Sequence, residues 1–292
     1  MLVRFIAHAG LYIEEDGTAL MVDPWFRSSS REYPLLESLQ GNSTIDFQDP
    51  PARETIENVK VDGILLSHFH AHHASRRDVL TLAQGQGVTI AHPHLGSEKN
   101  ASVANAFTTL PVKILPCQDG SEFTIGIFKI RALAHTSPNH LAWFVESPTA
   151  RILHLVDING TNGAFFPEAH KEVSRFKKLN PHMLFITAGG NHFRSESEGV
   201  KEVQESKNLS PVQGARMTRF IEPKGVSLIG CYNHSVWYNN IEYMRHSSVI
   251  EHEFHWALSW LAPETRSVFM KPGHTFGLGD PSLSTSVDTY IG

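Results

Sequence analysis

Four histidines stand within six residues of one another in the segment 67–73, which reads Ser-His-Phe-His-Ala-His-His. Alternate residues of an extended chain face the same way, so His68 and His70 can hold one metal ion. The chain must turn after this pair, which lets His72 and His73 reach a second ion or the far side of the first. A tag-like surface cluster is the alternative, and it fits poorly because the segment is internal and follows an apolar run. We therefore interpret the cluster as a metal site.

The elements that must position this cluster are short strands and a few helices. The apolar run 63–66 directly before the cluster predicts a buried strand, and Asp16-Gly17 predicts a hairpin turn near the N-terminus. The predicted strands are Val3–Ala7, Leu11–Glu14, Ala19–Val22, Val61–Ser67, Val88–Ala91, Val112–Leu115, Glu122–Ile125, Ile127–Ala134, Leu141–Val145, Arg151–Val156, His182–Thr187 and Gly225–Gly230. The predicted helices are Ser75–Gln84, Phe166–Lys178, Ser210–Ile221 and Ile250–Leu261, with Ser75 as an N-cap and Pro211 in a first turn.

Strands followed by helices occur twice along the chain, and this indicates two sheets packed face to face with helices outside. No repeat, low-complexity tract or domain boundary interrupts the pattern, so we expect one domain over residues 1–292. The stretch from Arg27 to Glu57 is polar, contains proline and is long for a plain connection. We expect it to form a flap or a partner-facing loop, with Trp25 and Phe26 contributing to a lid.

The composition excludes several classes of function. A hydrophobic content of 41% with 19% charged residues is typical of a soluble globular protein. A net charge of -5 without a basic run argues against a nucleic-acid partner. The N-terminal apolar run is too short for a signal sequence or a membrane span, so we expect a cytoplasmic protein without a membrane partner. Two cysteines, Cys117 and Cys231, do not make a disulfide framework.

Three further candidate ligands follow predicted strands, where each strand gives way to a turn. They are His135, Asp157 and His234. A histidine at one strand end is weak evidence by itself, but the shared placement of all three residues is informative.

With these positions the chain resembles the metallo-β-lactamase-fold superfamily, whose signature is His-x-His-x-Asp-His after a strand, followed by a His, an Asp and a final His. The segments His8-Ala9-Gly10, Val22-Asp23-Pro24-Trp25 and Lys271-Pro272-Gly273 are similar to the branch that contains ascorbate-6-phosphate lactonase and CMP-N-acetylneuraminate hydroxylase. The resemblance implies an α+β fold, a four-layer αββα sandwich, with two metal ions at one edge.

The resemblance also implies a role for each candidate ligand. The implied set is His68, His70 and His135 for the first ion, His73 and His234 for the second, Asp157 between the ions, and Asp23 behind the cluster. His72 stands where the family motif has Asp, so the site loses one negative charge. We expect His72 to ligate the second ion and, with Asp157, to act in catalysis; the alternative is that it swings out and leaves the second site weak or empty.

Other histidines receive lesser roles. We expect His8 and His192 to lie near the substrate or behind the ligands. His92 and His94 flank a proline after a strand, and we expect both of them at the surface.

The sequence favours a metal-dependent hydrolase that uses a metal-bound hydroxide on a small ester, lactone, amide or phosphoester. The alternatives are a dinuclear iron oxygenase on the same fold and a non-catalytic metal-binding protein. The expected cofactors are two divalent transition-metal ions, with zinc favoured and iron or manganese as alternatives. The expected partner is a small-molecule substrate, and the long loop favours a homodimer.

Overall fold

The fold is described from a computed structural model of the 292-residue chain. The structure describes residues 1–26, 59–70, 72–84, 87–107, 109–135, 137–158, 171–189, 209–230 and 247–279, together with the backbone of strands 43–47, 193–197, 200–204, 234–238 and 241–245. Within these ranges, no helix has the length and apolar character that a membrane crossing requires.

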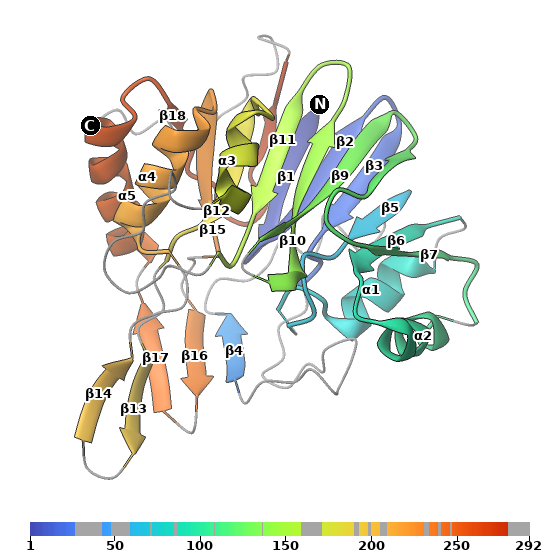
Figure 1. Ribbon diagram of the computed structural model, residues 1–292, viewed down its shortest axis with the longest axis horizontal. Helices are drawn as coiled ribbons and strands as arrows, with labels where there is room; N and C mark the ends of the chain where they lie inside the picture. The colour runs from blue at the N-terminus through green and yellow to red at the C-terminus, as the bar shows by residue number, and fades with distance from the viewer. Residues whose placement is uncertain are drawn as a thin grey trace.

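The first large sheet is mixed and has seven strands in the order β19-β1-β2-β3-β5-β6-β7 (Figure 1). These strands are β1 (Leu2–Ala7), β2 (Gly10–Glu15), β3 (Thr18–Val22), β5 (Gly63–Leu65), β6 (Thr89–Pro93), β7 (Lys113–Cys117) and β19 (Thr275–Gly277). The strands from β19 to β3 pair antiparallel, and those from β3 to β7 pair parallel. Asp16 and Gly17 have φ angles of 47° and 74°. Positive φ at both positions suits a tight hairpin, which confirms the predicted turn.

The second large sheet repeats this arrangement, with seven strands in the order β18-β15-β12-β11-β10-β9-β8. These strands are β8 (Glu122–Ile125), β9 (Phe128–His135), β10 (Ser137–Glu146), β11 (Arg151–Leu155), β12 (Met183–Thr187), β15 (Gly225–Ile229) and β18 (Arg266–Ser267). The strands from β8 to β11 pair antiparallel, and those from β11 to β18 pair parallel. Every residue of β12 and β15 is buried, as expected for strands that are covered on both faces.

Three apolar cores show that the sheets form the middle of a four-layer sandwich. One core joins residues of both sheets, including Phe5, Val22, Trp143 and Phe185. A second core lies between the first sheet and two helices, and a third lies between the second sheet and three helices (Figure 1). The helices are α1 (Arg76–Ala83), α2 (Ser97–Asn105), α3 (Lys171–Lys177), α4 (Pro211–Ile221) and α5 (Ser247–Leu261). The predicted αββα architecture is confirmed.

Two helix starts were readable from the sequence. The Ser75 side chain accepts a hydrogen bond from the Asp78 backbone N–H at the start of α1. Ser210 and Gln213 form a reciprocal capping box at the start of α4, with Pro211 in the first turn. α2 was not predicted, because Ser97–Asn105 is polar and buries only Val103.

Two small sheets accompany the sandwich and lie beyond one edge of it (Figure 1). One contains β4 (Ser43–Phe47), β16 (His234–Tyr238) and β17 (Ile241–Arg245), and the other is the hairpin of β13 (Phe193–Ser197) and β14 (Val200–Gln204). β4 belongs to the stretch that was expected to be a loop, and it pairs antiparallel with β16, His234 opposite Phe47. The remainder of 27–57 lies outside the described residues.

The expectation that Trp25 and Phe26 belong to a lid is wrong. Trp25 is 3% exposed and Phe26 is fully buried, and Phe26 belongs to the core under α1. The Phe26 backbone N–H donates to Asp78 Oδ2 at 2.9 Å, which ties the end of this segment to helix α1. An apolar side chain with this anchor contributes to packing and does not move over a substrate.

Candidate metal centre

The histidine cluster occupies the turn between β5 and α1. After β5 the chain curls at once, because the backbone N–H groups of His73 and Ala74 both donate to the His70 carbonyl at 2.9 Å. This turn keeps His68 and His73 buried, while His70 remains exposed. The histidine side chains therefore lie around one position at the edge of the first sheet.

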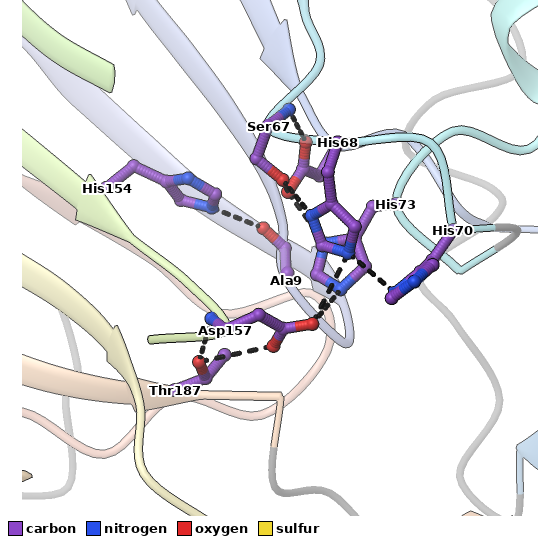
Figure 2. A network of polar contacts seen from close by, with 9 residues as sticks. Ala9, Ser67, His68, His70, His73, His154, Asp157 and Thr187 are labelled. Atoms are coloured by element: carbon purple, nitrogen blue, oxygen red, sulfur yellow. Dashed lines mark hydrogen bonds and ion pairs between the residues drawn. The ribbon is translucent and has the colours of Figure 1, made fainter. Parts of the chain in front are cut away.

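The second sheet brings its own donors to this point. One ligand atom from each of His68, His70, His72 and Asp157 lies within 4.8 Å of the others. The ring centroids of His68 and His70 are 4.4 Å apart, and those of His68 and His73 are 4.0 Å apart. Figure 2 shows His68, His70 and His73 pointing toward Asp157 from the opposite sheet. The predicted cluster is thus a compact set of imidazoles facing one carboxylate.

Asp23 orients two of these imidazoles through buried hydrogen bonds. Its carboxylate accepts from the Ser67 backbone N–H at 2.7 Å, from Ser67 Oγ at 2.6 Å and from His73 Nδ1 at 2.8 Å. The Ser67 hydroxyl hydrogen points at Asp23, so Ser67 Oγ accepts from His68 Nδ1, 2.9 Å away. Both rings therefore carry a proton on Nδ1 and direct Nε2 into the cluster. Such outer partners fix the tautomer and orientation of metal-binding histidines.

Asp157 is held at the opposite side of the cluster. Its φ of 51° is left-handed, and its backbone N–H donates to Thr187 Oγ1 at 2.6 Å. Thr187 Oγ1 also donates to Asp157 Oδ1 at 3.4 Å, as Figure 2 shows. Asp157 Oδ2 lies 3.3 Å from His68 Nε2 and 3.4 Å from His73 Nε2. The carboxylate thus faces Nε2 of both rings whose Nδ1 side is oriented by Asp23.

The protonation states of the centre follow from this packing. Burial holds the pKa of His68 and of His72 well below the usual imidazole range, and the neighbouring His73 lowers both further. Burial would also lower the pKa of His73, but the carboxylates of Asp157 and Asp23 outweigh it and raise that pKa to about 9. Burial would raise the pKa of Asp157, yet His73 and His68 hold it well below its usual value. A proton on His73 therefore balances the carboxylates wherever no cation does so.

The donor set fits divalent transition metals. Neutral imidazoles with one carboxylate suit zinc, iron, copper or nickel better than magnesium or calcium. The ring nitrogens approach one another closely, with 2.9 Å between His68 Nε2 and His70 Nδ1. A cation held between these ring nitrogens would replace the proton on His73, because either one balances the negative charge of the carboxylates.

The other predicted site residues are placed less completely. His135 is the last residue of β9 and is 3% exposed, and burial together with His140 lowers its pKa to about 3. It is not in the group whose ligand atoms lie within 4.8 Å of one another, so its ligand role stays a prediction. His234 is the first residue of β16 and its side chain is not described, and His192 lies outside the described residues.

Sequence reasoning missed His140 and His154. His140 is on β10, and its ring stacks on that of His68 at 4.5 Å with an interplanar angle of 27°. The register between β9 and β10 shifts just before it, and the Leu141 backbone N–H donates to the Ser67 carbonyl at 2.9 Å. His154 Nε2 donates to the Ala9 carbonyl at 2.9 Å (Figure 2). Both lie inside strands, where no local signal separates a site residue from a core residue.

The placement of His92 at the surface is wrong, although His94 is exposed as expected. His92 is fully buried in β6, and its Nδ1 donates to the Pro93 carbonyl at 2.8 Å. Its ring contacts Phe69 with a centroid separation of 5.5 Å. The strand continues through Pro93, two residues further than predicted, and this keeps His92 in the core.

An ion pair holds the backbone next to His135. Arg175 on α3 contacts both carboxylate oxygens of Asp119 at 2.6 and 2.7 Å and also donates to the Ala134 carbonyl. Asp119 Oδ1 accepts from the Ala134 backbone N–H at 2.9 Å. Both polar groups of Ala134 are thus fixed by one Arg–Asp pair, which joins α3 to the end of β9.

Replacing Asp119 with asparagine is expected to lower the melting temperature by roughly 2 °C, because partly exposed ion pairs contribute up to about 1 kcal/mol. Burial raises the pKa of Asp119, but hydrogen bonds from Arg175 and Ala134 outweigh it and lower that pKa. The stabilisation is complete above the unfolded pKa of about 4 and is lost as pH falls through the lower folded value. Thermal melts of both proteins from pH 7 to pH 2 should therefore converge at acidic pH. A constant difference would contradict the role of the ion pair.

Comparison with known proteins identifies a family and a relative that match this chain. Residues 18–188 match the family described as "Beta-lactamase superfamily domain". A protein of Carboxydothermus hydrogenoformans called a UPF0173 metal-dependent hydrolase is 27% identical over 222 residues, which cover 70% of this chain and 79% of that protein.

Two solved structures share the fold at low sequence identity. Igni18, a metallo hydrolase from Ignicoccus hospitalis, has a TM-score of 0.59 and 16% identity, with 95% of this chain and 98% of that chain covered. CmlA, a diiron β-hydroxylase from Streptomyces venezuelae, has a TM-score of 0.63 and 13% identity, with 95% of this chain covered but only 54% of that chain.

Proposed function

The chain belongs to the β-lactamase superfamily, and from this premise we propose that it is a metal-dependent hydrolase of a small ester, lactone, amide or phosphoester. The observation that carries the proposal is the convergence of His68, His70, His72 and Asp157, whose ligand atoms lie within 4.8 Å of one another. The relative from Carboxydothermus hydrogenoformans, which is named a metal-dependent hydrolase, supports the same class of reaction.

Divalent ions held by these side chains would supply Lewis acidity and lower the pKa of a coordinated water. We propose zinc as the resident metal, with iron or manganese as alternatives, and His68, His70 and Asp157 as ligands of the first ion. His135 remains a further candidate for that ion, from the end of β9.

The chain's own residues have distinct tasks in this proposal. Asp23 bonds Nδ1 of His73 directly and Nδ1 of His68 through Ser67, so that Nε2 of each ring faces the centre and can bind a cation. Asp157 faces both nitrogens with Oδ2, while Thr187 holds Oδ1 and fixes the direction of the carboxylate. Because His72 replaces a carboxylate, the loaded centre would carry more positive charge. Such a centre favours substrates whose reaction develops negative charge on oxygen.

Elemental analysis of protein purified without a histidine tag, followed by turnover assays on ester, lactone, amide and phosphoester probes, tests the proposal. We expect two divalent ions per chain, a colourless protein and metal-dependent hydrolysis of at least one probe class. Chelation should remove the activity, and zinc or manganese should restore it. Metal-loaded protein that hydrolyses none of the four classes would contradict the proposal.

A dinuclear iron oxygenase is the second candidate, because of the excess of imidazoles over carboxylates at the centre. Histidine-rich ligation suits iron as well as zinc, and the fold is shared with CmlA, which is a diiron β-hydroxylase. Bound iron, visible absorption and consumption of O2 in the presence of a reductant would favour this candidate over the hydrolase.

The proposed partner is a small-molecule substrate, and we also propose a homodimer. The homodimer rests on the length of the stretch from Arg27 to Glu57, of which the structure describes only β4. Sedimentation equilibrium measures the mass directly: about 65 kDa supports the dimer, whereas the chain mass of 32.6 kDa contradicts it.

A further inference from the structure

A second group of three imidazoles shares His72 with the first group. One ring nitrogen from each of His8, His72 and His73 lies within 4.8 Å of the others. The ring centroids are 4.8 Å apart for His8 and His72, 5.0 Å for His8 and His73, and 4.5 Å for His72 and His73. His8 comes from the turn between β1 and β2, whereas the other two come from the turn after β5.

These separations are those of imidazoles that share one ion. A metal–nitrogen distance of about 2.0–2.1 Å places each ring centroid about 3.2 Å from the ion. Two such rings at ligand angles between 90° and tetrahedral then have centroids about 4.5–5.2 Å apart. All three observed distances fall in this interval, and the planes of His8 are nearly perpendicular to those of its partners, at 89° and 75°. An ion at this position would bind one nitrogen of each ring, and for His73 this is Nε2 because Nδ1 is bonded to Asp23.

The backbone at His8 is strained and held in place by the other sheet. Its φ is 50°, a left-handed conformation that is uncommon for residues other than glycine. The His8 carbonyl accepts from the Gly230 backbone N–H at 2.7 Å, and the adjacent Ala9 carbonyl accepts from His154 Nε2 at 2.9 Å. Strain of this kind persists only where surrounding contacts over-determine the conformation, and it is concentrated at functional sites.

The pocket around the three rings is closed on one side. His8 is 7% exposed, and its ring lies edge-on to the indole of Trp25 at 5.4 Å. Trp25 also approaches His72, at 6.0 Å, and is itself 3% exposed. Catalytic zinc sites likewise use three protein ligands, and the burial of His8 and Trp25 would keep bulk water from this side of the ion.

We infer that His8, His72 and His73 form a three-imidazole site for one divalent ion, and that His8 is therefore a metal ligand. The inference rests on the metal centre of the proposed function and deepens it by naming the ligands of the second ion. It leaves His68, His70 and Asp157 to the first ion. It also accounts for histidine at position 72, since the second ion then has a ligand set complete without the carboxylate of the family motif.

The test is a His8→Asn variant, because asparagine tolerates the left-handed conformation better than alanine. His252→Asn is the matched control, since His252 is exposed on α5. Zinc per chain is measured by elemental analysis, and affinity is measured by competition with a chromogenic chelator. We expect His8→Asn to lose one ion per chain, or to bind its weaker ion on the order of 100-fold less tightly. The control should bind zinc as the unmodified protein does.

Cobalt substitution provides a second readout that does not depend on turnover. Co²⁺ bound to three imidazoles absorbs in the visible range, and both His8→Asn and His72→Ala should lose the same portion of this absorption. Unchanged stoichiometry, affinity and cobalt spectrum in His8→Asn would overturn the inference. That result would leave the proposed hydrolase intact, because hydrolysis of the probe substrates is measured separately on the unmodified protein.

Discussion

Replacing Asp23 with asparagine is expected to weaken metal binding roughly 10²- to 10⁴-fold while the chain still folds, since loss of one outer partner typically costs 10- to 100-fold and Asp23 serves two ligands. Asparagine has the same shape, and its Oδ1 can still accept from the Ser67 backbone N–H. Its Nδ2, however, would donate where Asp23 Oδ2 accepts from Ser67 Oγ and His73 Nδ1. The proton of His73 would then move to Nε2. Ser67 would donate to His68 Nδ1, and His68 would change tautomer in the same way.

Two further variants separate this tautomer effect from a general loss of stability. Ser67→Ala removes the hydroxyl that links Asp23 to His68 but keeps the bond between Asp23 and His73, so its loss of affinity should lie between those of the unmodified protein and Asp23→Asn. Asp62→Asn is the control, because Asp62 accepts a backbone hydrogen bond from Ala19 at 2.8 Å in the same sheet, outside the metal centre. Chelator competition measures the metal affinity, and thermal melts measure the stability, of the unmodified protein and the three variants. Equal metal affinity in Asp23→Asn and Asp62→Asn would refute the orienting role of Asp23.

The second large effect is expected from Asp157→Asn, which should reduce metal-dependent turnover by more than about 100-fold. The variant removes the negative charge that faces His68 and His73 at 3.3 and 3.4 Å. Asparagine accepts the left-handed backbone at this position, so the fold should be retained. Steady-state kinetics and metal content are measured together on the same preparation.

Thr187→Val is the graded comparison for Asp157→Asn. It removes the hydroxyl that bonds both the backbone and Oδ1 of Asp157 but leaves the charge in place. We expect a loss of turnover clearly smaller than that of Asp157→Asn. If asparagine at position 157 left both turnover and metal content unchanged, Asp157 would have no part in the centre.

Much of the fold could be predicted because its signals are local. The strand before the histidines, the Asp16-Gly17 turn and the serine caps of α1 and α4 each depend on residues within one short segment. The His-x-His spacing is local as well, because alternation along an extended chain places His68 and His70 on one side. Such patterns constrain each element independently of the remainder of the chain.

The parts that escaped prediction depend on contacts between segments that are distant in sequence. His140 is inside β10, and its ring stacks on that of His68 where the Leu141 backbone N–H donates to the Ser67 carbonyl of the other sheet. His8 was expected near the substrate or behind the ligands, because nothing in its own segment shows that His72 and His73 lie 4.8 and 5.0 Å away. Trp25 was expected in a lid, and packing against His8 explains its burial instead. In each case the deciding neighbour is distant in sequence.

The strand that completes the first sheet comes from the other end of the described chain. The sheet therefore cannot be assembled in the order in which its strands are synthesised. β19 pairs with β1, and the Leu278 backbone N–H donates to the Met1 carbonyl at 2.7 Å. At about 5–20 residues per second, a ribosome needs roughly 10–50 s to make the chain between these strands. Throughout that interval β1 has an open edge, which is prone to wrong pairing. The first sheet therefore reaches its full strand order only after residues 275–277 have been synthesised.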